Sequence, residues 1–330
     1  MKSEFLSHYY QKFSMSIKDN VISNMPKLIW LLKFSNPIIN ILNKLPIFSQ
    51  IIEWFGFSSN RSLPVVENQN PLKEIYKDQP LSEKKVILFA DTFNINFEIK
   101  NLVYAIKVLN KFDYQAIIPS FHNDNLNRPL CCGRTYISFG QLDKAQKELE
   151  RFTGYIIDNG YHELPVVGIE PSCLLTFNDE FKSFPKLKNR NKIKNKFLLL
   201  EEFVLNEIKK GNKIKSKDFN KNVLIHGHCH QKSQNRIKGL TDLLNELNIK
   251  NSMIDSSCCG MAGSFGYSSK HYEVSKKMAY LSLIPKINNS SDKDYVIANG
   301  TSCRHQISDF SNKKPKHISE LLFNLFETIN

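Results

Sequence analysis

Four cysteines in the second half of the chain are spaced so that they could hold a metal. Cys229 lies in the motif HGHCHQK, Cys258 and Cys259 lie in SSCCGMAGSFG, and Cys303 closes YVIANGTSC. Four thiolates are the usual ligand set of a cubane iron–sulfur cluster and of tetrahedral zinc. A disulfide between adjacent cysteines would close a strained ring. The pattern therefore favours a metal centre over a redox pair or a packing detail.

The first half carries a shorter version of the same pattern. Cys131 and Cys132 open CCGRTYISFG, Cys173 closes GIEPSC, and Thr92 stands where the second half has Cys229. These three thiols, with Glu170 nearby, could bind zinc or bind nothing.

Histidines and arginines cluster around the cysteines of the second half. His226, His228 and His230 alternate within HGHCHQK, so in one extended strand they would all face away from Cys229. We expect the strand to end at Gly227, which leaves His228 and His230 as candidate ligands, proton carriers or packed polar residues.

Arginine is scarce in this chain, yet two arginines follow motif cysteines closely. Arg134 comes just after the first Cys-Cys-Gly, and Arg304 directly follows Cys303, with His305 next to it. A guanidinium there could offset thiolate charge or bind a substrate carboxylate.

The segments around the cysteines predict α/β units with parallel strands. KKVILFA (84–90) is a buried-strand pattern, NLVYAIKVLNKF (101–112) is helical, and QAIIPS (115–120) is a second strand. Each Cys-Cys-Gly precedes a helical pattern, and a helix N-terminus lowers thiolate pKa values. Parallel strands would bring the four cysteines of the second half to one edge of a sheet.

Internal matches indicate a tandem duplication. VILFADTF pairs with VLIHGHCH, CCGRTYISFG with CCGMAGSFG, and VVGIEPSC with YVIANGTSC. We predict four segments, which are a helical arm and linker (1–83), a first repeat (84–182), a basic connector (183–221) and a second repeat (222–330). Helix breaks are expected at Pro37 and Pro46, and the arm either packs on protein or touches a membrane interface.

The composition of the chain indicates which cell compartment and which partners to expect. The 330 residues include 45 basic and 32 acidic side chains, which gives a net charge of +13, and most of the basic residues are lysines. This excess would attract an acidic partner or an anionic membrane, or it reflects compositional bias alone. The basic tract lacks interleaved aromatic residues, which argues against nucleic acid. Seven cysteines without a signal peptide indicate a reducing cytoplasm, with peripheral attachment to the inner face of the membrane as an option.

The motifs resemble those of the cysteine-rich CCG domain family. This family includes a cysteine-rich subunit of heterodisulfide reductase, the one designated B, and the iron–sulfur subunits of glycolate oxidase, lactate utilisation and anaerobic glycerol-3-phosphate dehydrogenase. The chain is most similar to the C-terminal part of fused FAD-linked D-lactate and D-2-hydroxyglutarate dehydrogenases. LFADTF, RPLCCGRT, GIEPSCLLT, HGHCHQK, SCCGMAGSFGY and ANGTSCRHQI carry the resemblance and, with the opening MKSEFLSHYY, cover nearly the whole chain.

This resemblance implies an electron-transfer component of an FAD-dependent D-2-hydroxy-acid dehydrogenase, inactive alone, that passes electrons toward a quinone or similar acceptor. FAD and ferredoxin-type clusters would lie on a partner subunit or on missing N-terminal domains, because no flavin-binding or ferredoxin segment is recognisable here. A 4Fe-4S cluster would be held in the second repeat. The residues expected around it are Arg134, Glu170, His228, His230, Arg304 and His305.

The chain also departs from the family pattern. The family ends each half with a C-x-x-C pair, but the first member of that pair is Glu170 in one half and Gly300 in the other. At most one four-thiolate site therefore remains. Two alternatives stay open, a zinc-binding or metal-free scaffold that docks the flavoprotein, and a heterodisulfide or thiol-disulfide reductase.

Overall fold

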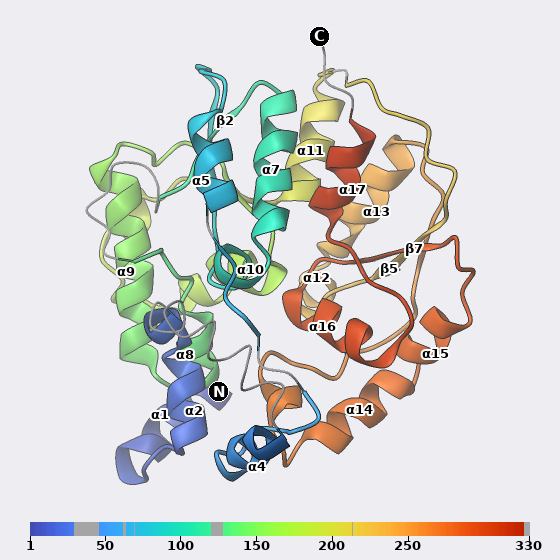
Figure 1. The fold of residues 1–330 in the computed structure, drawn as a ribbon. Helices are drawn as coiled ribbons and strands as arrows, with labels where there is room; N and C mark the ends of the chain where they lie inside the picture. The colour runs from blue at the N-terminus through green and yellow to red at the C-terminus, as the bar shows by residue number, and fades with distance from the viewer. Residues whose placement is uncertain (30–45, 62–63, 69, 120–127, 213, 327–330) are drawn as a thin grey trace.

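The computed structural model describes residues 1–29, 46–61, 64–68, 70–119, 128–212 and 214–326 (Figure 1). The helix break predicted at Pro37 lies outside these ranges. Two parallel sheets covered by helices form the body, and short helices form an arm at the N-terminus. The predicted α/β class and the helical arm are therefore confirmed.

The first sheet has four parallel strands in the order β2-β1-β3-β4. Their bounds are β1 (Lys85–Phe89), β2 (Gln115–Ile117), β3 (Val166–Gly168) and β4 (Phe197–Leu199). All residues of β1 after Lys85 are buried, which explains why this strand is a continuous apolar run instead of an alternating one. The accompanying helices are α6 (Asn94–Phe97), α7 (Ile99–Lys111), α8 (Arg134–Ser138), α9 (Leu142–Asp158), α10 (Pro171–Asn178) and α11 (Leu200–Lys209).

The second sheet has three parallel strands in the order β6-β5-β7. Their bounds are β5 (Val223–His226), β6 (Asn251–Met253) and β7 (Tyr295–Ala298). The accompanying helices are α12 (Cys229–Ser233), α13 (Ile237–Glu246), α14 (Tyr272–Tyr280), α15 (Leu283–Asn288), α16 (Thr301–Phe310) and α17 (Ile318–Leu325).

The two sheets repeat one topology. β1 and β5 are the central strands, and their last residues, Phe89 and His226, pair with Gly168 and Ala298 at the ends of β3 and β7. A parallel bridge from Ile297 to Lys316 takes the place that β4 has in the first sheet, and α17 follows it as α11 follows β4. The duplication inferred from the motifs thus extends to strand order and pairing register.

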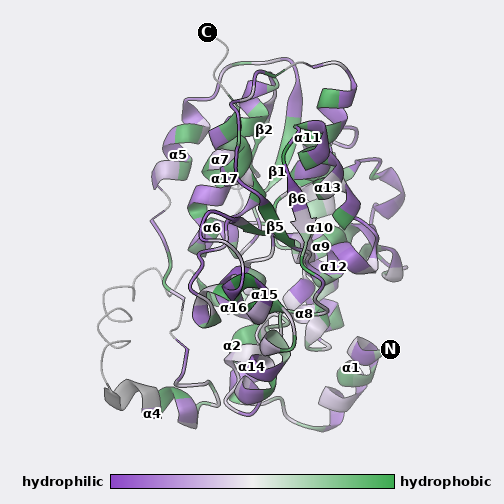
Figure 2. Cartoon of the chain, turned by 90° about the vertical axis from the view of Figure 1, so that its right-hand side faces the viewer, coloured by the Kyte–Doolittle hydropathy of each residue, from purple (hydrophilic) through white to green (hydrophobic). Residues whose placement is uncertain are grey.

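The repeats share one hydrophobic core. Helix α7 packs against α17 of the other repeat, and α11 packs against α13 in the same exchanged way (Figure 1). One cluster of buried side chains includes Leu88 and Leu102 of the first repeat together with Ile225 and Leu322 of the second. In Figure 2 the hydrophobic strands β1 and β5 lie in the interior between helices. The segment predicted as a connector (183–221) holds β4 and the buried face of α11 besides its lysines, so β4 and α11 are counted below with the first repeat.

The N-terminal arm lies against both repeats. Its described helices are α1 (Lys2–Lys12), α2 (Ile17–Ser23), α4 (Pro46–Trp54) and α5 (Asn70–Lys77). Helix α1 contacts α9, α2 contacts α8, and α5 packs on α7. Arg61 donates a hydrogen bond to the carbonyl of Gly266 (2.9 Å) and forms an ion pair with Asp309. None of the described helices combines the length and apolarity that crossing a membrane requires.

Candidate metal centre

The four cysteines of the second repeat lie at the carboxyl edge of its sheet. Cys229 begins α12 directly after β5, Cys258 and Cys259 follow β6, and Cys303 lies in the first turn of α16 after β7. Strand β5 ends at His226, as expected from Gly227. Because these strands are parallel, three turns far apart in sequence come together at one edge.

The sulfur atoms of these cysteines form a chain of neighbours. Cys229 interacts with Cys258, Cys258 with Cys259, and Cys259 with Cys303. Cys259 and Cys303 are buried, whereas Cys229 and Cys258 are partly exposed. The four sulfur atoms, the possible metal-donor set, therefore form a continuous series from the interior of the repeat to its surface.

His226 extends this donor set, although the motif alone did not single it out as a ligand. Its imidazole is buried, its Nδ1 lies 3.0 Å from the hydroxyl of Ser256, and its Nε2 has no hydrogen-bond partner among the described residues. The ligand atoms of His226, Cys259 and Cys303 all lie within 4.8 Å of one another. Zinc bonds of about 2.0–2.3 Å separate tetrahedral ligands by about 3.5–3.8 Å, so a small closure would suit one ion.

The pKa values of the four thiols are shifted in different directions. The hydrogen bond from Cys259 lowers the pKa of Cys303 well below the usual value, and nearby imidazoles act the same way against the effect of burial. Hydrogen bonds from Cys229 and Cys259 likewise lower the pKa of Cys258, and the N–H of Gly260 donates to it at 3.3 Å. The pKa values of Cys229 and Cys259 are raised because both interact with Cys258. The thiolate form, which binds metals, is therefore favoured at Cys258 and Cys303 over Cys229 and Cys259.

The imidazole of His228 packs over Gly300, where the sequence departs from the expected C-x-x-C pair. A Cβ atom added to Gly300 would overlap Cδ2 of His228 and would lie 3.4 Å from the sulfur of Cys303. His228 therefore fills the space beside Cys303 that a side chain at position 300 would need. Its Nδ1 accepts a hydrogen bond from the N–H of His230 (3.2 Å), which places His228 as the N-cap of α12.

His230 and Arg134 meet across the two repeats. The ring Nε2 of His230 lies 2.8 Å from the guanidinium of Arg134, which also forms an ion pair with Glu180. Burial, followed by the charges of Arg134 and His228, lowers the pKa of His230 to about 3. A neutral His230 can accept the hydrogen bond of Arg134, whose guanidinium also lies near Cys132 and Cys173 of the first repeat.

Arg304 and His305 follow Cys303 in sequence, but their hydrogen bonds go to groups other than thiols. The guanidinium of Arg304 forms an ion pair with Glu98 and donates to the carbonyls of Ala298 and Asn299, each at 2.8 Å. The Nδ1 of His305 lies 2.9 Å from the hydroxyl of Tyr267.

The first repeat gathers its three cysteines in the same way but in different surroundings. Cys131 interacts with Cys132, and Cys132 with Cys173. All three are buried, and Cys132 and Cys173 belong to a hydrophobic cluster that includes Phe89. The pKa of Cys131 is raised by its hydrogen bond to Cys132 and by burial. Within the described residues, these thiols join no group of three ligands close enough for one ion.

Comparison with known families identifies the second repeat. Residues 223–308 match the cysteine-rich domain named CCG. This match covers the segment from β5 into α16 and contains His226 and all four cysteines of the thiol chain. The family resemblance predicted from the motifs is therefore confirmed for this repeat.

Curated relatives of the chain are dehydrogenases or their subunits. The subunit designated C of anaerobic glycerol-3-phosphate dehydrogenase from Escherichia coli K12 is 24% identical over 199 residues, which cover 60% of this chain and 50% of that protein. D-2-hydroxyglutarate dehydrogenase of Haemophilus influenzae is 21% identical over 348 residues, which cover 99% of this chain and 32% of that protein. The enzyme of the same name from Pseudomonas putida is 21% identical over 337 residues, which is 97% of this chain and 31% of the enzyme. The chain spans about half the length of the first relative and about a third of the others.

Proposed function

We propose that this chain is the electron-transfer component of an FAD-dependent D-2-hydroxy-acid dehydrogenase of the D-lactate, glycolate or D-2-hydroxyglutarate type. The observation that carries the proposal is the uninterrupted chain of Cys229, Cys258, Cys259 and Cys303 that ends at His226. The CCG match and the dehydrogenase relatives support a redox role for such a donor set.

In this proposal the four thiols hold an iron–sulfur cluster, which when bound carries electrons one at a time. The protein contributes thiolates at Cys258 and Cys303, whose pKa values are lowered by their thiol neighbours. His226 adds a nitrogen donor from the buried end. Electrons would enter or leave at the partly exposed end, Cys229 and Cys258, because the tunnelling path to a partner is shortest there.

The remaining machinery belongs to partners in this proposal. FAD would accept the hydride from the hydroxy acid on a partner subunit or domain, with ferredoxin-type clusters as intermediates and a quinone or similar acceptor at the end. The free cysteines support a reducing cytoplasm. Peripheral attachment to the inner face of the membrane would bring the chain close to a quinone.

A structural zinc site is the second candidate, and the compactness of the donor set favours it. Three ligand atoms within 4.8 Å suit one ion, whereas a cluster of four irons needs ligands spread around a larger body. A zinc-bound second repeat would act as a scaffold that docks the flavoprotein without carrying electrons.

Anaerobic purification with iron, sulfide and zinc analysis separates these candidates. The proposed function predicts iron and sulfide in the full chain, with an electron paramagnetic resonance signal after reduction. One zinc per chain with no iron would establish the scaffold. Full-length folded protein without any metal would contradict both, and failure to recover a flavoprotein with the chain from its native host would contradict the dehydrogenase assignment.

A further inference from the structure

Three carboxylates of the first repeat reach into the turns that carry the thiols of the second. They are Glu98, Glu170 and Glu201, called here the cross-repeat carboxylates. Glu170 and Glu201 are buried, and Glu98 is largely so. A buried carboxylate is costly unless it is paired or hydrogen-bonded, so the partners of these side chains show what they hold in place.

Glu170 caps the helix that carries Cys303. Its Oε2 accepts a hydrogen bond from the backbone N–H of Thr301 at 2.8 Å, and its Oε1 accepts one from the hydroxyl of Ser172 at 2.7 Å. Thr301 is the first residue of α16, whose own N-cap, Gly300, has no side chain to offer. The first repeat thus supplies the cap that the second repeat lacks, two residues before Cys303.

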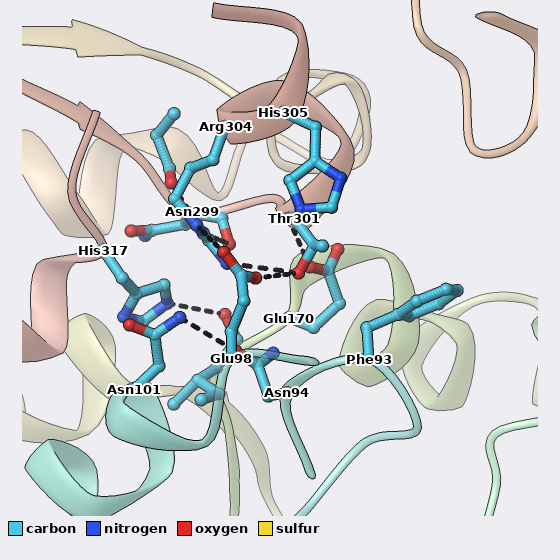
Figure 3. Close-up of polar contacts among 12 residues, drawn as sticks. Phe93, Asn94, Glu98, Asn101, Glu170, Asn299, Thr301, Arg304, His305 and His317 are labelled. Atoms are coloured by element: carbon cyan, nitrogen blue, oxygen red, sulfur yellow. Dashed lines mark hydrogen bonds and ion pairs between the residues drawn. The ribbon is translucent and has the colours of Figure 1, made fainter. Parts of the chain in front are cut away.

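Glu98 holds the same turn from another side (Figure 3). Its carboxylate forms the ion pair with Arg304 and accepts a hydrogen bond from the hydroxyl of Thr301 at 2.6 Å. Burial raises the pKa of Glu98, but the charge of Arg304 and the hydrogen bonds from Arg304 and Thr301 outweigh it and lower the pKa to about 2. Arg304, fixed in this way, binds the carbonyls of Ala298 and Asn299 and closes the turn that leads to Cys303.

Glu201 joins two thiol-bearing segments to each other. Its Oε1 accepts hydrogen bonds from the side-chain amides of Gln231 (2.8 Å) and Asn299 (2.9 Å). Gln231 lies in α12 with Cys229, and its side-chain Oε1 accepts a hydrogen bond from the backbone N–H of His228 at 3.3 Å. One carboxylate of α11 therefore sets the spacing between the Cys229 segment and the Cys303 turn.

The second repeat does not return these contacts. The matching topology of the two repeats makes certain positions equivalent: Glu170 corresponds to Gly300, Glu98 to Arg236 and Glu201 to Ser319. Among the described residues, His317 approaches the carbonyl of Ile169 at 2.9 Å, but no carboxylate of the second repeat hydrogen-bonds to a thiol-bearing turn of the first. The support by carboxylates therefore runs from the first repeat to the second, among the described residues.

We propose that the cross-repeat carboxylates are positioning residues that hold the metal-binding turns of the second repeat in place, so that the first repeat serves as a template for that site. This inference rests on the proposed metal binding by the second repeat. It gives the first repeat, whose three thiols are buried, a role that needs no metal of its own.

The test measures Co²⁺ affinity of the full chain under anaerobic conditions, because thiolate-to-cobalt absorption reports binding at the thiols directly. Glu170→Ala removes the cap and should weaken Co²⁺ binding about tenfold, the effect of losing a helix cap. Glu170→Gln keeps a carbonyl acceptor and should stay within about threefold of wild type. Glu98→Gln, which keeps its size, provides a second variant and should weaken binding by at least about threefold.

Controls separate positioning from general stability. Glu163→Ala removes an exposed carboxylate far from the site, and it should leave the affinity unchanged. A merely structural role would lower the melting temperature of the metal-free chain without changing Co²⁺ affinity. Wild-type affinity in folded Glu170→Ala and Glu98→Gln would overturn this inference but would leave the proposed function standing. A wild-type chain that takes up neither Co²⁺ nor any other metal would instead contradict the proposed function and this inference with it.

Discussion

The central strands of the two repeats end on different side chains, His226 in the second repeat and Phe89 in the first. Both residues hold the same register against the neighbouring strand. Around His226 the thiols approach one another with a nitrogen donor beside them, whereas Phe89 packs against Phe152 and Phe177 in an aromatic cluster. One fold therefore supports either a polar donor set or an apolar core at the same place.

A second difference lies where the family pattern expects the first cysteine of a pair. The second repeat has Gly300, over which the imidazole of His228 packs, and the first repeat has Glu170, which reaches out to cap α16. The two equivalent positions thus differ in role, since Gly300 leaves room for a histidine and Glu170 reaches across to the helix that carries Cys303.

The largest expected difference between the two repeats is tested by a matched pair of serine substitutions. Cys259→Ser and Cys132→Ser change equivalent buried thiols in the two repeats. We expect Cys259→Ser to reduce metal affinity by more than the roughly 10- to 100-fold that loss of an outer-sphere partner costs, because a ligand is removed. Cys132→Ser should retain the wild-type metal content. Metal analysis of both purified variants checks this, and equal metal loss in the two would mean that the repeats are alike.

Replacing His226 by Phe makes the second repeat resemble the first. Removing the nitrogen donor should weaken Co²⁺ binding by at least about tenfold and change the cobalt spectrum. His162→Phe, on an exposed histidine of the first repeat, serves as the control. An unchanged cobalt spectrum in His226→Phe would show that His226 only packs beside the thiols.

Gly300→Ala tests the close approach of His228. The added methyl would overlap the imidazole, so we expect the free energy of unfolding to fall by about 1–3 kcal/mol, the usual cost of overpacking. Urea unfolding measures the change. The double variant with His228→Ala should recover part of the loss, and additive losses would contradict the contact.

The last prediction concerns the pH dependence of Glu201. Burial, followed by the charge of Glu202, raises the pKa of Glu201 from 4.5 to about 8. The folded chain keeps a proton that the unfolded chain releases, so the free energy of unfolding should fall as pH rises between these values, by up to about 1.4 kcal/mol per pH unit.

Glu201→Gln should flatten this slope, whereas Ser319→Ala, at the equivalent position of the second repeat, should leave it intact. Urea unfolding from pH 5 to pH 9 measures both variants. A slope in Glu201→Gln as steep as in wild type would show that another group causes it.

The sequence by itself determined the local elements and the set of candidate ligands. The apolar run of β1, the strand-turn-helix order around each Cys-Cys-Gly and the three repeated motifs predicted parallel α/β units and placed the four cysteines at one sheet edge. The structure confirms these expectations because they depend on short-range periodicity and on the rule that parallel strands present their carboxyl ends together.

Only the tertiary structure decided which side chains support the thiols. His226 was passed over because its neighbours in HGHCHQK look equivalent until the strand end orients each ring. Glu98 and Glu201 carry no motif, and they lie 205 and 102 residues before Cys303. Their contacts arise from the exchanged packing of α7 and α11 onto the other repeat, which long-range burial selects and which no local pattern encodes.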